Sequence, residues 1–411
     1  MSNPVSGRKP GSGEDTEHFA FIDALRGWAF LAVLAVHVHV PAQAPAWLNG
    51  IQVAGNYGVQ LFFVISALTL FMSYESRRKR DRHPVAAFFV RRLFRIAPLF
   101  WLAIPFYLWH IGLGPRASAP NGIHWPQIVS TSLFLHGWHP ASINSVVPGG
   151  WSIATEMTFY LILPLCFRAL PDLRRCVVAC GAALVFSVGI SLIMRRWLTT
   201  LYPVEQTDLI RSFLYFWFPG QLPVFLLGFV LHFLIKRFPR SSGEAPAEGS
   251  RRWSVLLLPS LALAWILGMV IFQQRVPMAY FLFSCGFVLL GLGLSRQPLW
   301  ILVNPISRYA GKVSYSAYLT HFFIVEQLTT LISNQSTKAP MERHPVASLL
   351  VAYLLCLAGT LAISTVTHYL IEVPGQNLGK WLIRRCAWGP SAAPPLDQAR
   401  IGSAGEIVRP L

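Results

Sequence analysis

The sequence predicts an all-α, polytopic membrane protein with about ten transmembrane helices in one bundle and both termini in the cytoplasm. Three observations predict this fold class: the composition, the long uncharged stretches, and the placement of the basic residues. Only 12% of the 411 residues are charged and 54% are hydrophobic, whereas soluble domains carry about 25% charged residues. This composition excludes a disordered chain, a coiled coil and a disulfide-stapled secreted module.

Ten stretches are long and apolar enough to be spans, since a transmembrane helix needs about 20 mostly apolar residues. The first two lie within 27–74, which contains no Asp, Glu, Lys or Arg, on either side of a Pro/Gly/Asn-rich segment at 41–56. We therefore expect a cytoplasmic tail over 1–18, a transmembrane domain over 19–374 and a second cytoplasmic tail over 375–411. The other predicted spans are 96–115, 151–170, 176–194, 212–235, 253–272, 276–295, 313–333 and 346–371.

The excess of basic residues agrees with this order of spans. The chain has 34 Lys and Arg against 17 Asp and Glu, a net charge of +17. With a cytoplasmic N-terminus, 27 of the basic residues lie on the cytoplasmic side and 7 on the opposite side. Cytoplasmic loops are enriched in Lys and Arg, so the charge records topology and argues against a nucleic-acid partner.

Several other sites are not predicted. None of the six cysteines lies in an outer loop and no CxxC spacing occurs, so neither a disulfide framework nor a metal site is expected. We find no glycine-rich phosphate loop and no dinucleotide fingerprint. The long outer loop at 116–150 is rich in His, Trp and Pro, and we expect it to fold back over the bundle as an interfacial or re-entrant cap.

Ionisable residues inside spans are costly and indicate function. Arg26 and His37 are eleven residues apart in the first span, which is a rise of about 16 Å along a helix. They fall on nearly one face, which predicts Arg26 at the inner surface and His37 well inside the bundle. A histidine satisfied within the core is the alternative for His37 alone. His39 points to the other side and is expected to be a packed histidine at the outer end.

Arg92 and Arg95 open the third span at i, i+3 spacing and so share a face. Two guanidinium groups at the mouth of a bundle suit bidentate binding of phosphate. Binding of anionic lipid headgroups is the alternative.

Ser152, Glu156 and Tyr160 recur every four residues and form one polar stripe on the predicted helix. The carboxylate in this stripe could orient an imidazole or contact a sugar hydroxyl. Hydrogen bonding between helices is the alternative.

Together these segments resemble the bacterial membrane-bound acyltransferase 3 family, whose members O-acylate carbohydrates and other cell-surface or secreted molecules. Six segments in the family's order carry the resemblance. In two positions of the second segment the chain departs from the pattern: Gln60 stands where the family has an acidic-like polar residue, and Ala67 where it has Gly. The segments are Phe21-Ile22-Asp23-Ala24-Leu25-Arg26-Gly27 with His37, 58–67, Arg91-Arg92-Leu93-Phe94-Arg95-Ile96-Ala97-Pro98, Trp151-Ser152 with Glu156, Phe159, Tyr160 and Pro164, 313–321 and Tyr369-Leu370-Ile371-Glu372-Val373-Pro374.

The resemblance implies a cytoplasmic acyl-CoA donor as co-substrate, with no permanently bound cofactor, and an acceptor hydroxyl reached within or across the inner membrane. Arg26 and His37 would be the central pair, and Arg92 and Arg95 would hold the CoA phosphates or its adenine-nucleotide end. His37 would act as general base on the acceptor or briefly carry the acyl group. Arg26, Ser314 or Tyr318 would stabilise the developing oxyanion. The extracytoplasmic hydrolase-like domain of many members is expected to be absent.

The leading hypothesis is therefore an inner-membrane O-acyltransferase, with an acetyl group as the first choice and a glycan or glycosylated metabolite as acceptor. A proton-coupled transporter or flippase is the alternative, because ten spans with buried histidines also suit transport; paired broken helices would favour it, and the two halves show no such similarity. The catalytic candidates are His37, Arg26 and Glu156, and the donor-binding candidates are Arg92 and Arg95. The substrate-binding or supporting candidates are Asp23, Trp151, Ser152, Tyr160, Ser314, Tyr315, Tyr318 and His321.

Overall fold

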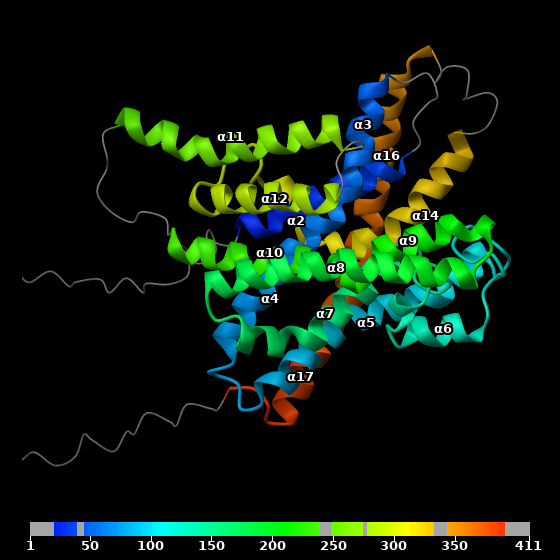
Figure 1. The fold of residues 1–411 in the computed structure, drawn as a ribbon, viewed down its shortest axis with the longest axis horizontal. Helices are drawn as coiled ribbons and strands as arrows, with labels where there is room; N and C mark the ends of the chain where they lie inside the picture. Colours follow the sequence, from blue (N-terminus) through cyan, green and yellow to red (C-terminus); the bar gives the residue numbers. More distant parts are fainter. Residues whose placement is uncertain (1–19, 39–44, 239–247, 274–277, 333–342, 391–411) are drawn as a thin grey trace, which may run out of the picture.

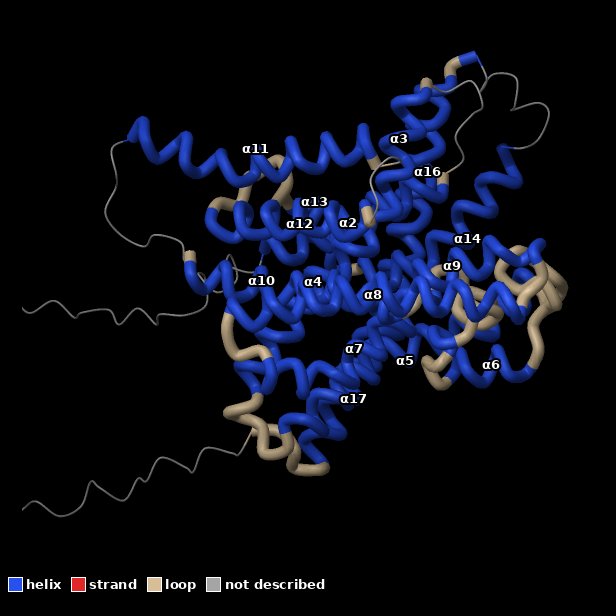
Figure 2. Tube along the Cα trace, viewed as in Figure 1, coloured by secondary structure: helices blue, strands red, loops and turns tan. Residues whose placement is uncertain are grey.

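A computed structural model describes residues 20–38, 45–238, 248–273, 278–332 and 343–390. Over these residues the chain is helical and contains no β-strand (Figure 2). Both predicted tails lie largely outside the described residues, and so does His39. Each of the ten ranges in which a span is predicted contains a helix, and the range 212–235 is divided between two helices, Thr207–Phe216 and Phe218–Arg237.

The helices are α2 (Ala20–His37), α3 (Ala46–Ala54), α4 (Gly58–Arg77), α5 (Pro84–Ile111), α6 (Trp125–Ser132), α7 (Gly150–Ala169), α8 (Leu173–Leu201), α9 (Thr207–Phe216), α10 (Phe218–Arg237), α11 (Glu248–Phe272), α12 (Ala279–Arg296), α13 (Pro305–Lys312), α14 (Ser314–Ile332), α16 (Pro345–Thr367) and α17 (Val373–Arg385), with a π-helical turn at His368–Glu372.

Seven helical segments within the described residues are long and apolar enough to cross a membrane. The chain is therefore a multi-pass membrane protein, while the count of ten spans and the orientation of the termini stay predictions. The seven segments are Ala20–His37, Trp47–Arg77, Gly150–Ala169, Leu173–Leu201, Val204–Arg237, Ala279–Arg296 and Pro345–Arg385.

Two boundaries differ from the predicted ranges. α5 begins at Pro84 and not at residue 96. The predicted range started after the last arginine of the preceding basic segment, whereas the helix itself also includes these arginines. After the π-helical turn, α17 continues the chain as a helix through the first part of the predicted C-terminal tail, and its buried glycines pack on α5.

α2 lies inside the bundle and packs against α4, α13 and α14. Glycines allow the closest of these contacts: a Cβ on Gly27 would stand 2.0 Å from the Ser307 carbonyl oxygen, and one on Gly311 would stand 1.7 Å from that of Asp23. Small residues are the usual means by which membrane helices approach closely. Figure 1 shows α11 and α12 side by side at one edge of the molecule and α17 at the opposite edge.

The segment 116–150 packs onto the bundle, as expected of a cap. Its Phe134 ring stacks on Phe100 of α5 with 5.1 Å between the ring centroids, and Val146 and Val147 are buried. The segment leads directly into the first turn of α7 and so helps to position the polar stripe of that helix.

Candidate functional site

A cavity of about 70 Å³ lies where α2, α4, α5, α7 and α14 meet. We call it the first cavity. Eight of the candidate residues from the sequence line it, although they come from four helices that are far apart in the chain. These are Arg26, Arg95, Ser152, Glu156, Tyr160, Ser314, Tyr315 and Tyr318. Val59, Phe62 and Phe63 of α4 supply an apolar wall.

Hydrogen bonds fix the hydroxyl groups around this cavity. Tyr160 donates to a carboxylate oxygen of Glu156 at 2.7 Å, within the α7 stripe. Ser152 donates to the Tyr318 hydroxyl at 2.9 Å, which in turn donates to the Gly149 carbonyl oxygen at 3.0 Å. Gly149 has φ = 72°, and a Cβ at this position would clash with Tyr318 and Phe322. The end of the cap, where it joins α7, is therefore packed closely against α14.

The arginines give this region an excess of positive charge. The Arg26 guanidinium donates to the Thr69 hydroxyl at 3.1 Å, and it is close enough to Arg92 and Arg95 to interact with both electrostatically. Glu156 acts electrostatically on Arg26 and Arg92, and Asp23 acts on Arg26 as well, yet no ion pair joins Glu156 to these arginines within the described residues. Three guanidinium groups around one carboxylate favour the binding of an anion.

Arg92 does not line the first cavity, although Arg95 does. Its guanidinium lies over the Phe88 ring at 5.8 Å, and its Nε is buried without a hydrogen-bond partner. An unsatisfied buried donor is costly, so Arg92 is poised to bind an acceptor that is not part of the chain.

His37 is placed differently from the prediction. It is the last residue of α2 and its side chain is exposed, so it lies at the end of the helix and not well inside the bundle. The His37 ring contacts His321, at 5.2 Å between centroids, and Phe322, at 4.7 Å. It does not line the first cavity.

His321 connects His37 with the first cavity. It is fully buried and its Nδ1 lies 2.8 Å from the Tyr318 carbonyl oxygen. Because a carbonyl only accepts, Nδ1 carries the proton and Nε2 presents a lone pair. That Nε2 has no hydrogen-bond partner among the described residues. His37, His321, Tyr318 and Ser152 thus follow one another from the end of α2 to the start of α7.

Asp23 and Trp151 do not line the first cavity. The Trp151 ring stacks on Phe216 at 4.3 Å and meets Phe63 edge-on, which makes it part of the packing behind the cavity. Asp23 lines a second, larger cavity of about 640 Å³ between α2, α4 and α10. Arg26 lines both cavities.

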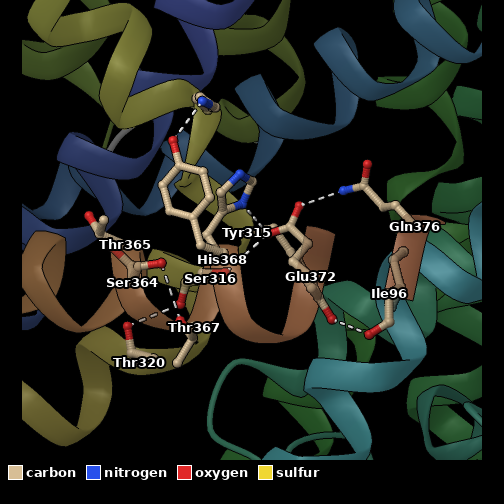
Figure 3. Close-up of polar contacts among 12 residues, drawn as sticks. Ile96, Tyr315, Ser316, Thr320, Ser364, Thr365, Thr367, His368, Glu372 and Gln376 are labelled. Carbon is tan, nitrogen blue, oxygen red and sulfur yellow. Dashed lines mark hydrogen bonds and ion pairs between the residues drawn. The ribbon is translucent and has the colours of Figure 1, made fainter. Parts of the chain in front are cut away.

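A buried polar cluster next to the first cavity was not among the candidates (Figure 3). Glu372 in the π-helical turn accepts hydrogen bonds from Ser316 at 3.0 Å, from His368 at 2.9 Å and from Gln376 at 3.2 Å. The adjacent Tyr315 donates to the Ile96 carbonyl oxygen at 2.6 Å. The cluster therefore fixes the turn of α14 that lines the cavity to α5 and to the π-helical turn. The available signal in the sequence was a carboxylate at the end of a long apolar run, two residues before Pro374. The π-helical turn adds to it, since such turns often occur at functional sites.

His136, in the cap, supports the start of α7. It is buried with its Nε2 3.0 Å from the Gly150 carbonyl oxygen. Burial lowers the pKa of His136 to about 4, so the ring is neutral at pH 7 and donates its single N–H to that carbonyl.

Comparison with known proteins shows the family of this chain. Residues 19–369 match the Acyl_transf_3 family, described as an acyltransferase domain. The chain is 26% identical over 395 residues to "Acyltransferase MdmB" of Streptomyces mycarofaciens, covering 92% of this chain and 96% of the relative. It is 24% identical over 397 residues to "Putative O-acetyltransferase SACOL0978" of Staphylococcus aureus (strain COL), covering 91% of this chain and 59% of that protein. This chain thus spans about three fifths of the staphylococcal relative.

No solved structure matches this fold significantly. The family match covers nearly the whole described bundle, including all five helices of the first cavity. The chain therefore belongs to the acyltransferase 3 family and is a membrane enzyme that transfers acyl groups.

Proposed function

We propose that this enzyme is an inner-membrane O-acyltransferase that moves a short acyl group, with acetyl as the first choice, from acyl-CoA to a hydroxyl of a glycan or glycosylated metabolite. The observation that carries the proposal is the first cavity. Arg26, Arg95 and Glu156 meet there with the hydroxyls of Tyr160 and Tyr318, in a family of acyl-transferring enzymes.

The positive charge around this cavity supports a donor that carries phosphates. Arg92 has a buried donor without a partner, and Arg95 faces the cavity. Guanidinium groups bind phosphate oxygens through charge-assisted hydrogen bonds. Arg92 and Arg95 are therefore assigned to the CoA moiety, as cationic anchors for its phosphates.

The size of the cavity supports a short acyl group. At about 70 Å³, with Phe62, Phe63 and Tyr318 on its walls, it has room for a small group next to the polar side chains. A long acyl chain would have to displace these packed rings.

The transfer itself needs a base and an oxyanion donor. The acceptor oxygen attacks the thioester carbonyl, its proton passes to His37, the C–S bond breaks, and CoA leaves as the thiolate. In the covalent form, a His37 nitrogen attacks first and the acceptor hydroxyl then takes the acyl group from it. Ser314 and Tyr318 are the donors proposed for the oxyanion of this step.

Spacing along α2 divides the roles of Arg26 and His37. About 16 Å of helical rise separates them, so one carbonyl group cannot contact both side chains at once. Arg26 then holds another part of an extended donor, or the acyl group reaches His37 after it has left CoA. His321, with its Nε2 lone pair beside the His37 ring, is placed to share the proton.

Purified protein in lipid nanodiscs, supplied with radiolabelled acetyl-CoA and a panel of glycans, tests the proposal. We expect CoA release that depends on an acceptor, and we expect the His37→Ala variant to lose it because the base or acyl carrier is gone. His344→Ala is the matched control, because His344 is an exposed histidine at the start of another helix.

Two results would count against the proposal. Normal acyl transfer by the His37→Ala variant would remove the role of His37. Absence of CoA release with every acceptor and every acyl-CoA tested would contradict the donor.

A further inference from the structure

The π-helical turn between α16 and α17 is held by one buried carboxylate (Figure 3). Glu372 is 3% exposed. It accepts hydrogen bonds from Ser316, His368 and Gln376, and both of its oxygens are used. These three donors come from α14, from the turn itself and from α17. Glu372 therefore joins three elements at the point where the chain passes from α16 into α17.

α17 packs directly on the part of α5 that carries the candidate arginines. A Cβ on Gly375 would stand 2.9 Å from the Phe94 carbonyl oxygen, and one on Gly379 would stand 2.7 Å from the Phe94 Cβ. The two helices thus meet with no room for a side chain on either glycine. Because Gln376 lies between these glycines and donates to Glu372, the carboxylate fixes which face of α17 contacts α5.

A second link to α5 comes from the first turn of α14. Ser316, which donates to Glu372, directly follows Tyr315 in the chain. The Tyr315 hydroxyl donates to the Ile96 carbonyl oxygen at 2.6 Å. Ile96 is the residue after Arg95, so Arg95 lies between this hydrogen bond and the contact of α5 with α17.

This turn of α5 is weakened in its own backbone. Pro98 lies inside the helix and has no N–H, so the Phe94 carbonyl oxygen lacks the hydrogen bond that residue 98 would otherwise donate. Helices bend at such positions. Arg95 belongs to the weakened turn and lines the first cavity. Contacts from outside α5 therefore help to fix where its guanidinium stands.

We propose that Glu372 is a positioning residue for Arg95: through α17 and Tyr315 it holds the weakened turn of α5 so that the guanidinium faces the first cavity. This inference rests on the proposed function, in which Arg95 binds a phosphate of the CoA donor. Glu372 does not line the first cavity, so it acts on the donor at one remove.

Positioning and electrostatics predict effects of opposite sign. A negative charge near a phosphate site weakens phosphate binding, so a purely electrostatic role of Glu372 would make its removal strengthen the binding of CoA. A positioning role makes removal weaken it. The sign of the change in Kd therefore distinguishes the two.

Titration of CoA into protein in nanodiscs measures this change without any acceptor. We expect Glu372→Ala to raise the Kd about 10-fold, at the lower end of the loss typical of a hydrogen bond to a charged group. Glu372→Gln should restore the Kd to within about twofold, because its amide oxygen can accept from Ser316 and His368 while Gln376 turns its own amide oxygen toward the new N–H group. Loss of folded protein alone lowers the number of binding sites and leaves the Kd unchanged.

A milder variant covers the case in which Glu372→Ala does not fold. Ser316→Ala removes one of the three donors and leaves the carboxylate bonded to the other two. Ser316 is fully buried and does not line the first cavity. We expect its Kd for CoA to rise about 3-fold, the loss typical of a single hydrogen bond.

A double-mutant cycle shows whether Glu372 acts through Arg95. Arg95→Ala alone should raise the Kd for CoA about 10- to 100-fold. In that background Glu372→Ala should raise it no further, because effects that pass through one shared interaction do not add. Tyr353→Phe is the matched control: it removes a hydrogen bond from α16 to the Leu31 carbonyl oxygen of α2, at 3.0 Å, and Tyr353 lines neither cavity. Its Kd should equal that of the unmodified protein.

The outcomes separate this inference from the proposed function. If Arg95→Ala weakens CoA binding while Glu372→Ala and Ser316→Ala bind CoA normally, or more tightly, Glu372 does not position Arg95 and the proposed function stands. Additive effects of Glu372→Ala and Arg95→Ala would likewise overturn the inference. If the unmodified protein binds no CoA, the proposed donor fails and the inference fails with it.

Discussion

Tyr318 is the side chain at which the hydrogen bonds of the first cavity converge. It accepts from Ser152 of α7, donates to the Gly149 carbonyl, and belongs to the same helix as His321. Its hydroxyl therefore ties the cap, α7 and α14 together, and it also lines the space in which the acyl group is proposed to react.

We predict that Tyr318→Phe lowers kcat about 100- to 1,000-fold, the loss typical when an oxyanion donor is removed. The Kd for CoA should be unchanged, because the Tyr318 hydroxyl is not among the groups assigned to the phosphates. Steady-state kinetics and CoA titration provide the two numbers.

Tyr107→Phe is the control for this variant. It also removes a buried hydroxyl that donates to an α14 carbonyl, that of Leu319, at 2.6 Å, but Tyr107 does not line the first cavity. Equal losses of kcat in the two variants would show that Tyr318 acts by stabilising the fold and not on the reacting atoms.

At the scale of single residues, the sequence predicted the residues that line the first cavity better than it predicted the position of His37. Periodicity along one helix correctly placed Ser152, Glu156 and Tyr160 on a common face, and all three line the cavity. It could not show where α2 ends, and so His37 was expected too deep. Glu372 was noted only as part of a motif, because its partners Ser316 and His368 are brought to it by packing between helices.

Among the helices, the α2–α13 contact places Arg26. Gly27 follows Arg26 directly, and the backbones of the two helices meet at Gly27 and Gly311 with no room for a side chain on either. The hydrophobic pattern predicted α2 as a span, but it said nothing of α13, which is short and polar.

We predict that Gly311→Ala forces α2 and α13 apart, destabilises the protein by about 1–3 kcal/mol as overpacking does, and reduces activity by moving Arg26. Thermal unfolding in detergent and acyl transfer measure the two effects.

Gly189→Ala is the matched control, because Gly189 lies within α8 and a Cβ there would meet nothing within 4 Å. Replacing Gly by Ala within a helix stabilises it by about 0.5–1 kcal/mol. A Gly311→Ala variant as stable and active as Gly189→Ala would mean that the close α2–α13 contact does not position the site.

For the whole molecule, hydropathy predicted where helices occur and not how they are grouped. Each predicted range contains a helix, because an uncharged run of 20 residues has few alternatives in a membrane protein. The arrangement of α2, α4, α5, α7 and α14 around one cavity depends on which helices touch, and a single sequence carries little information about that.

Topology can be tested with two cysteines in a Cys386→Ser background. Lys79 follows α4 and Glu205 follows α8, and both are exposed. α5, α7 and α8 lie between them, so the three predicted spans would place the two residues on opposite sides of the membrane. We predict that Glu205→Cys reacts with an impermeant thiol reagent added to intact cells, and that Lys79→Cys reacts only after permeabilisation.

This pair also tests α5, which is not among the seven segments that qualify as spans by length and composition. Labelling of both cysteines on one side would mean that α5 does not cross. The reversed pattern would place both termini outside, against the distribution of basic residues.

The fixed position of α2 has a consequence for the choice of donor. Its first turns are locked against α13 by backbone contact, so the distance from Arg26 to His37 cannot shorten during turnover. A donor anchored beside Arg26 must be long enough to present its carbonyl farther along the helix. Under the proposed mechanism, small activated acyl compounds such as acyl phosphates satisfy the chemistry but not this length, and we expect the enzyme to reject them as donors.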